Sequence, residues 1–275
     1  MSVNYEQIAE QLSAGGFGKS CLTPSRKNIV TVIKVMQELM FPCFFSCECD
    51  LCRSTAEKVE ALKNKLSFEI RTAIAGKDGF ASPDEISAEI VSLLPEIQKK
   101  LMMDIKAIYE GDPAATSPEE VVLSYPGFLA ICIYRIAHEF YIRKIPLIPR
   151  IMTEYAHEKT GVDIHAGATI GDYFCIDHGT GIVIGETTTI GSRVKIYQGV
   201  TLGAKSFELD EDGNPVKGIK RHPDIGNNVV IYANATILGG NTKIGDNCVI
   251  GGNVWLTHSV PEGKVVYYNS DSTKA

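Results

Sequence analysis

The chain has 275 residues, of which 44% are hydrophobic, and its formal net charge at pH 7 is −6. This length accommodates one or two domains, and the acidic balance argues against a nucleic-acid-binding surface. No stretch approaches the roughly 20 consecutive apolar residues of a transmembrane helix. The first residues also lack the basic start and apolar core of a signal peptide. We therefore expect a cytoplasmic protein that binds neither nucleic acids nor membranes.

Residues 1–160 are expected to form a helical domain. Apolar residues recur every three or four positions behind a Ser-x-x-Glu capping box at 54–57. Residues 82–85 and 117–120 have the composition of helix starts, with proline in the first turn and acidic residues near the positive end of the helix dipole. A last helix is expected over about 146–159, because a glycine follows it.

Four of the eight cysteines lie together in the stretch CFFSCECDLC: Cys43, Cys47, Cys49 and Cys52. Structural zinc sites usually pair two CxxC-like knuckles, and only the last two of these cysteines form one. We therefore favour reduced thiols in a loop between helices over a metal site, and expect no bound metal. Cys175 and Cys248, further along the chain, are expected to pack as small apolar side chains.

From residue 162 onward, aliphatic residues recur at intervals of about six. They are Ile164, Ile170, Ile176, Ile184, Ile190, Ile196, Leu202, Ile225, Ile231, Ile237, Ile244, Ile250 and Leu256. A β-sandwich does not produce this period. It is typical of a parallel β-helix, in which three hexads form one triangular coil around stacked aliphatic side chains. The expected fold class is therefore α+β, with a β-helix domain over 161–275 whose flat faces associate into a trimer.

Two interruptions break this series. The first adds two residues between Ile176 and Ile184, and the second is a polar loop insertion over residues 204–223. Departures from a regular solenoid map to loops on its binding side. We therefore expect both interruptions to border the functional site.

A histidine lies at each interruption: His178 follows Asp177, and His222 follows Arg221. Histidine exchanges protons near neutral pH, and a neighbouring carboxylate can fix its tautomer. Asp177 could supply that carboxylate, and so could Asp163, which lies a little under one coil earlier. The remaining histidines are expected to be structural.

The segments VDIHAGATIG, DHGTGIVIGET, QGVTLGA and RHPDIG resemble the signature segments of the serine O-acetyltransferase family. The likeness continues upstream through DIKAIYEGDPAA and YPGFLAICIYRIAHEFY, so that it covers roughly residues 100–255. Members of this family are left-handed β-helix enzymes that acetylate L-serine from acetyl-CoA, giving O-acetylserine for cysteine synthesis. The resemblance therefore implies a left-handed parallel β-helix of hexapeptide repeats and this acyltransferase activity.

The resemblance also implies roles for acidic residues around the candidate base. His178 would be the general base that takes the serine hydroxyl proton, and Asp163 would orient it. Asp112, in the GDPAA segment, would bind the substrate ammonium together with Asp177. Transfer would be direct, with no acyl-enzyme, because the serine oxygen would attack the thioester while His178 handles the proton.

Other residues would act across a subunit boundary, again by resemblance. Arg221 and His222, the latter counted among the catalytic residues, would bind the substrate carboxylate. Acetyl-CoA, the expected co-substrate, would lie between neighbouring prisms near Ala204, Ala233 and Gly252, where small residues allow close approach.

Partners follow from the same family. L-Serine and acetyl-CoA are the expected substrates, L-cysteine the expected feedback inhibitor, and a homotrimer or a dimer of trimers the expected assembly. The chain departs from the family in its long 204–223 loop and in its ending, VVYYNSDSTKA. Many members end in an isoleucine that enters O-acetylserine sulfhydrylase. Because Ala275 offers less apolar area, we expect no tail-mediated complex with that enzyme.

Three other functions are alternatives to the acetylation of serine. A γ-type carbonic anhydrase would use His165, His178 and His222 on zinc, but the expected His-x4-His pair is absent and an arginine lies beside the last of them. A hexapeptide acetyltransferase for a sugar or an antibiotic would not need the helical domain or the Arg-His pair. A non-catalytic scaffold would not need an Asp-His pair at an interruption.

Overall fold

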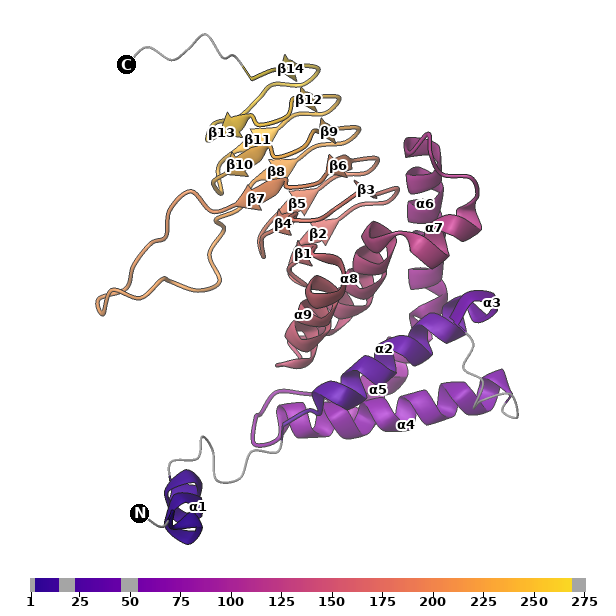
Figure 1. The fold of residues 1–275 in the computed structure, drawn as a ribbon, viewed down its shortest axis with the longest axis vertical. Coiled ribbons are helices and arrows are strands. Elements are labelled where there is room, and N and C mark those ends of the chain that lie inside the picture. Colours follow the sequence, from indigo (N-terminus) through magenta and orange to yellow (C-terminus); the bar gives the residue numbers. More distant parts are fainter. Residues whose placement is uncertain (1–2, 15–22, 46–53, 269–275) are drawn as a thin grey trace.

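The computed structural model describes residues 3–14, 23–45 and 54–268. In these ranges, helices occupy the N-terminal part of the chain and short strands wind into a column above them (Figure 1). The helices are α1 (Tyr5–Ala14), α2 (Arg26–Met40), α3 (Pro42–Phe45), α4 (Thr55–Ile74), α5 (Pro83–Ser92), α6 (Leu94–Gly111), α7 (Pro118–Ser124), α8 (Pro126–Ile142) and α9 (Ile148–Thr160).

The strands follow directly on α9. They are β1 (Asp163–Ile164), β2 (Thr169–Ile170), β3 (Cys175–Asp177), β4 (Val183–Ile184), β5 (Thr189–Ile190), β6 (Lys195–Tyr197), β7 (Thr201–Gly203), β8 (Asp224–Ile225), β9 (Val230–Ile231), β10 (Thr236–Leu238), β11 (Lys243–Ile244), β12 (Val249–Ile250), β13 (Trp255–Leu256) and β14 (Val265–Val266). The change from helix to strand thus falls between residues 160 and 163.

Local capping residues account for several helix boundaries. Ser54 and Ser82 begin α4 and α5 with complete capping boxes, each accepting a hydrogen bond from a backbone amide three residues later. α9 is capped at its C-terminus by Gly161, which adopts the left-handed φ of 69° that favours glycine. It begins two residues later than the sequence predicted, because Leu147 has a φ of 66° and cannot continue a helix.

The strands form three parallel sheets that are the faces of a triangular prism. We call them face 1 (β1-β4-β7-β10-β13), face 2 (β2-β5-β8-β11) and face 3 (β3-β6-β9-β12-β14). The predicted aliphatic residues pair in register from coil to coil and are all buried. On face 1, for example, Ile164 pairs with Ile184, Ile184 with Leu202, and Leu202 with Ile237. The parallel β-helix is therefore confirmed, and its left-handed winding stays a prediction.

The interruptions lie at two different corners of the prism. The 3/1 corner, where face 3 turns into face 1, consists of residues 178–182, 198–200, 232–235 and 251–254. The 1/2 corner consists of residues 165–168, 185–188, 204–223 and 239–242. The two extra residues of the first coil lie at the 3/1 corner, and the long insertion leaves the column at the 1/2 corner (Figure 1).

The helical part and the β-helix share one hydrophobic core. Helix α8 lies directly against the first coil: a Cβ on Gly127 would be 2.7 Å from the Ile176 carbonyl oxygen. The Tyr134 hydroxyl donates to the Ala168 carbonyl at 2.5 Å. This docking brings the C-terminal end of α6 and the N-terminal end of α8 next to the 3/1 corner of the first coil.

Cys175 and Cys248 are buried, as predicted, and burial raises the pKa of the Cys175 thiol to about 12. Cys43 is an exposed free thiol, while Cys47, Cys49 and Cys52 lie outside the described residues. The predictions about this cluster and about the tail at 269–275 therefore stay predictions. In the described part of the chain, no single helix has the length and apolar composition to cross a membrane. Among the described helices, α7 and α8 reach that level when taken together, and they meet at 76°.

Candidate active site

His178 occupies the 3/1 corner of the first coil in an unusual backbone conformation. Its φ of 58° lies in the left-handed region, where the corresponding turns of the later coils place a glycine or an asparagine: Gly199, Asn234 and Asn253. A histidine at such a position costs conformational energy, and strained residues of this kind cluster at functional sites. Its side chain is 74% exposed, and its Nε2 lies 3.7 Å from Oδ1 of Asp177.

Asp163 lies on β1, next to this corner. A Cβ on Gly179 would be 3.0 Å from the Val162 side chain, so the corner rests on the residue that precedes Asp163. Among the described residues, however, no hydrogen bond or ion pair joins the Asp163 carboxylate to His178; the carboxylate that contacts the ring is Asp177. The orienting role of Asp163 therefore stays a prediction.

Asp112 lies in the helical part of the chain but belongs to the same site as Asp177 and His178. It caps the C-terminus of α6, and its carboxylate accepts hydrogen bonds from the Ala114 amide at 2.8 Å and from the Tyr125 hydroxyl at 2.7 Å. The bond from Tyr125 is the main cause that lowers the pKa of Asp112, and the charges of Lys195 and His178 lower it further. Asp112 is thus ionised and oriented at neutral pH.

Lys195 links Asp112 and Asp177. Its Nζ is 2.9 Å from Oδ2 of Asp177 and 2.6 Å from the carbonyl oxygen of Gly111, the residue before Asp112. Neither Lys195 nor Tyr125 was predicted from the sequence. The signal for Lys195 was its outward position on β6, the strand that pairs with β3 one coil earlier, which becomes visible only once the coil length is known. We call Asp112, Tyr125, Asp177, His178 and Lys195 the acidic half-site.

Arg221 lies at the 1/2 corner with a carboxylate partner. Its guanidinium is 2.5 Å from Oε2 of Glu186, and the other oxygen of Glu186 accepts a hydrogen bond from Tyr141 at 2.6 Å. Burial opposes ionisation of Glu186, but these two hydrogen bonds and the charge of Arg221 outweigh it and lower the pKa of Glu186. Glu186 therefore holds the Arg221 side chain in place.

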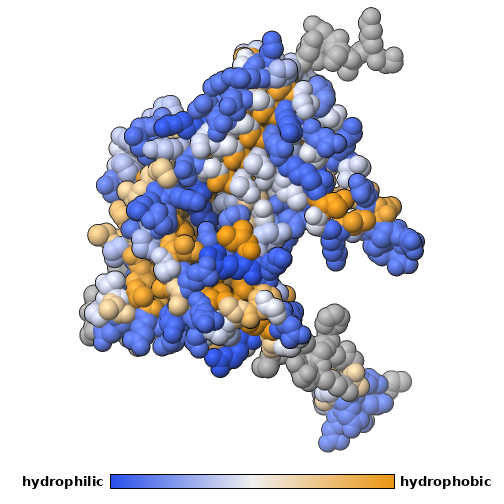
Figure 2. Space-filling model, turned by 180° about the vertical axis from the view of Figure 1, so that it is seen from behind, coloured by the Kyte–Doolittle hydropathy of each residue, from blue (hydrophilic) through white to orange (hydrophobic). Residues whose placement is uncertain are grey.

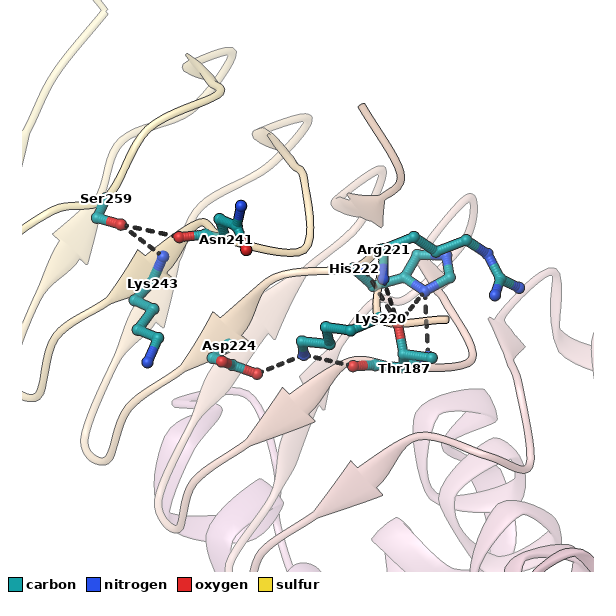
Figure 3. A network of polar contacts seen from close by, with 8 residues as sticks. All are labelled: Thr187, Lys220, Arg221, His222, Asp224, Asn241, Lys243 and Ser259. Carbon is teal, nitrogen blue, oxygen red and sulfur yellow. Dashed lines mark hydrogen bonds and ion pairs between the residues drawn. The ribbon is translucent and has the colours of Figure 1, made fainter. Parts of the chain in front are cut away.

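Thr187 organises the backbone around His222 (Figure 3). Its hydroxyl accepts hydrogen bonds from the amides of Arg221 and His222, at 3.0 and 3.1 Å, and its own amide donates to Nδ1 of His222 at 3.1 Å. Burial and the charge of Arg221 lower the pKa of His222 to about 4. His222 is therefore neutral at physiological pH with its proton on Nε2, so that of the Arg221-His222 pair only Arg221 is charged.

The insertion forms an open cavity beside Arg221. This cavity, of about 790 Å³, is lined by Glu186, Arg221 and loop residues between 207 and 218. Phe207 and Leu209, both on the insertion, are more than half exposed, and Figure 2 shows apolar residues on this protruding loop. We call Tyr141, Glu186, Thr187, Arg221 and His222 the basic half-site. The first three were not predicted from the sequence, although Glu186 and Thr187 lie within the segment DHGTGIVIGET that resembles the family.

The two half-sites lie at opposite edges of face 1. Among the described residues, no hydrogen bond or ion pair connects them. The candidate acetyl-CoA residues are divided in the same way: Ala233 and Gly252 lie at the 3/1 corner, and Ala204 lies at the 1/2 corner. The structure thus brings the predicted residues together as two groups, one anionic and one cationic.

The three histidines considered as zinc ligands are divided as well. His165 lies beside the basic half-site, and His178 belongs to the acidic one. Burial lowers the pKa of His165. The described residues contain no group of three or more histidine, cysteine, aspartate or glutamate side chains that could hold a metal ion.

Comparisons with known proteins place these features in a family. Residues 50–132 match the family model of the serine acetyltransferase N-terminal region, and residues 181–207 and 224–258 match that of the hexapeptide repeat of succinyl-transferase. A serine acetyltransferase of Staphylococcus aureus is 46% identical over 168 residues, which are 61% of this chain and 74% of that protein. The chain belongs to the serine acetyltransferase family.

Other similar proteins are also serine acetyltransferases. A plasmid-encoded serine acetyltransferase of Synechococcus elongatus is 54% identical over 66% of this chain, and the match spans only 57% of that protein's length. Among solved structures, serine acetyltransferase 1 of Entamoeba histolytica in complex with L-cysteine is 34% identical. It covers 95% of this chain and 97% of its own, with a TM-score of 0.76. The serine acetyltransferase of Neisseria gonorrhoeae in complex with serine is 28% identical over 94% of this chain and 98% of its own, with a TM-score of 0.59.

Proposed function

We propose that this protein transfers the acetyl group of acetyl-CoA to the hydroxyl group of L-serine. The observation that carries the proposal is the pair of half-sites, one with two carboxylates and the other with an oriented guanidinium. Asp112 and Asp177 suit the ammonium of an amino acid, and Arg221 suits its carboxylate. An acceptor without an ammonium, such as a neutral sugar, would leave the net negative charge of the acidic half-site uncompensated.

His178 is the proposed general base. It removes the proton of the serine hydroxyl as the oxygen attacks the thioester carbonyl, and it returns that proton to the CoA sulfur when the carbon–sulfur bond breaks. Its exposed ring at the 3/1 corner is free to meet a bound substrate. Cys175 takes no part, because burial keeps its thiol protonated with a pKa of about 12.

The complete site is proposed to form between two copies of the chain. If face 1 of each copy turns toward a threefold axis, each 3/1 corner meets the 1/2 corner of the next copy. Each interface then joins one acidic and one basic half-site, and a cyclic trimer has three sites. Acetyl-CoA would lie in the same seam, between Ala233 and Gly252 of one copy and Ala204 of the next. The exposed Phe207 and Leu209 fit this arrangement, because apolar side chains on a protruding loop gain by burial against a neighbour.

A thiol-release assay with acetyl-CoA tests the proposed activity. L-Serine, L-homoserine, a galactoside and chloramphenicol are offered as separate acceptors, and only L-serine is expected to support rapid turnover. Preference for the galactoside or for chloramphenicol would instead support a hexapeptide acetyltransferase of another specificity. Zinc measurement on the purified protein addresses the carbonic anhydrase alternative.

Mixing two inactive variants tests the shared site. We expect His178→Ala and Arg221→Ala protomers, each nearly inactive at low serine concentration, to regain activity when they are refolded together. In a random equimolar mixture, about one quarter of the interfaces combine an intact His178 with an intact Arg221, so activity should recover to about a quarter of the wild-type value. Mixing separately folded trimers is the control. No recovery after joint refolding would place the whole site within one chain.

L-Cysteine is proposed to compete with L-serine, because it presents the same ammonium and carboxylate. The Entamoeba relative in complex with L-cysteine supports this proposal. We expect Arg221→Ala to raise the KM for serine and the inhibition constant of cysteine by similar factors, about 10- to 150-fold, through loss of a charge-assisted hydrogen bond. Steady-state kinetics under reducing conditions measures both. A raised KM for acetyl-CoA would instead indicate a collapsed loop.

A further inference from the structure

We propose that Lys195 is a positioning residue that fixes Asp177 relative to the end of α6, in the geometry that receives the substrate ammonium. The inference rests on the proposed function and adds one residue to its amino-acid site. Lys195 lies on β6 with its side chain outside the prism, because the next residue, Ile196, points into the core.

Three partners surround the Lys195 ammonium. Nζ is 2.6 Å from the Gly111 carbonyl oxygen, 2.9 Å from Oδ2 of Asp177 and 4.5 Å from the centre of the Tyr197 ring. A lysine ammonium has three N–H donors and no acceptor. Two protein oxygens and the face of an aromatic ring therefore already engage the ammonium. For this reason we assign Lys195 a positioning role and no direct role in the reaction.

These contacts join two elements that are far apart in the sequence. Gly111 is the last residue of α6, and a cation near its carbonyl is favoured by the helix dipole. Asp112 follows as the helix cap, whereas Asp177 ends β3 in the β-helix. Lys195 thereby sets the spacing between two carboxylates that no direct contact holds together.

Lys195 also sets the charge of the acidic half-site. Asp112 and Asp177 alone would carry two negative charges that repel each other; with Lys195 the net charge is −1, which one substrate ammonium neutralises. Burial opposes the charge on Lys195, but its contacts with Tyr197 and Asp177 and the negative charge of Asp177 outweigh it, and the pKa of Lys195 is raised. The lysine therefore stays cationic throughout the neutral pH range.

A double-mutant cycle tests the inference. Lys195→Met keeps the length of the side chain and removes its ammonium. We expect it to raise the KM for L-serine about tenfold, with kcat and the KM for acetyl-CoA changed less than about twofold. In the D177N background, the same substitution should change the KM for serine less than about twofold, because the carboxylate through which Lys195 acts is gone.

Two further variants sharpen the test. Lys195→Arg keeps a cation with donors and is expected to bring the KM for serine back to within about threefold of the wild-type value. Arg193→Gln is the matched control. It removes a cation from the same coil whose guanidinium lies 4.2 Å from the Tyr173 ring and touches neither acid, so the KM for serine should not change.

Each other outcome decides against the inference. An unchanged KM for serine in Lys195→Met, or an equal effect in the D177N background, overturns it. A large fall in kcat overturns it as well, because Lys195 would then act in the reaction itself. Turnover of L-serine by the wild-type protein is measured first. If the protein does not turn over L-serine, the proposed function is wrong. If it does, but the effects of Lys195→Met and D177N on the KM for serine are additive, only the proposed role of Lys195 is wrong.

Discussion

Replacing His178 by alanine is expected to lower kcat at least about 100-fold while acetyl-CoA binding remains nearly intact, which is the loss typical of a missing general base. The physical reason is the position of the ring at the interrupted corner, beside Asp177 and exposed to the site. The backbone there is held in the left-handed region, and alanine is no better suited to it than histidine. Steady-state kinetics and equilibrium binding of acetyl-CoA measure the two effects separately.

His178→Asn distinguishes the missing base from a disturbed corner. Asparagine tolerates this backbone conformation, and Asn234 and Asn253 adopt it at the same corner of later coils. The asparagine variant should therefore fold normally and be as inactive as the alanine variant. His258→Ala, at an exposed histidine near the other end of the column, is the control and should keep full activity. Near-normal turnover of an assembled His178→Asn protein would contradict the role of the base.

The second large effect is expected on stability, at Asp104. Its carboxylate pairs with Arg135 through two hydrogen bonds, at 2.5 and 2.8 Å, and also accepts a bond from the Phe174 amide at 2.9 Å. The two side chains are 0% and 5% exposed. Asp104→Ala would leave the Arg135 charge buried without its partner. We therefore expect a loss of about 3–5 kcal/mol in the free energy of unfolding, measured by urea denaturation at one protein concentration.

The same helix offers a matched control for this stability prediction. Lys106 and Glu110 form an exposed pair on α6 at 3.7 Å, and Lys106→Ala should cost less than about 0.5 kcal/mol. Arg135 also donates to the Gly171 carbonyl in the first coil. The buried pair of Asp104 and Arg135 therefore connects α6 and α8 to the β-helix. A loss below about 1 kcal/mol for Asp104→Ala would show that hydrophobic packing alone holds this junction.

The sequence by itself determined the fold to a large extent, because the decisive signals are local. A capping box such as Ser54–Glu57 begins a helix through contacts within one turn. The period of six likewise requires only that each aliphatic residue face the inside of the same narrow prism. Ile170, Ile190 and Ile225 therefore pair as the spacing predicted. The main candidate residues, His178 and Arg221 among them, were also visible as departures from that period.

The tertiary structure alone decided which of these residues become neighbours. The first coil takes 20 residues from Ile164 to Ile184, whereas the next takes 18 from Ile184 to Leu202. This difference places Tyr197, and not Lys195, directly opposite Asp177. Only a long side chain reaching diagonally, together with the docking of α6, brings Lys195 to both Asp177 and Gly111.

The separation of the two half-sites also depends on how the coil closes. His178 and Arg221 are 43 positions apart in the chain, and periodicity alone assigns each of them to an interruption without saying which corner it occupies. Closing three faces around the aliphatic core places them at opposite edges of face 1. The contacts of Thr187 and Glu186 with the end of the insertion arise in the same way. They depend on the path by which the long loop returns to the column, and no local pattern encodes that path.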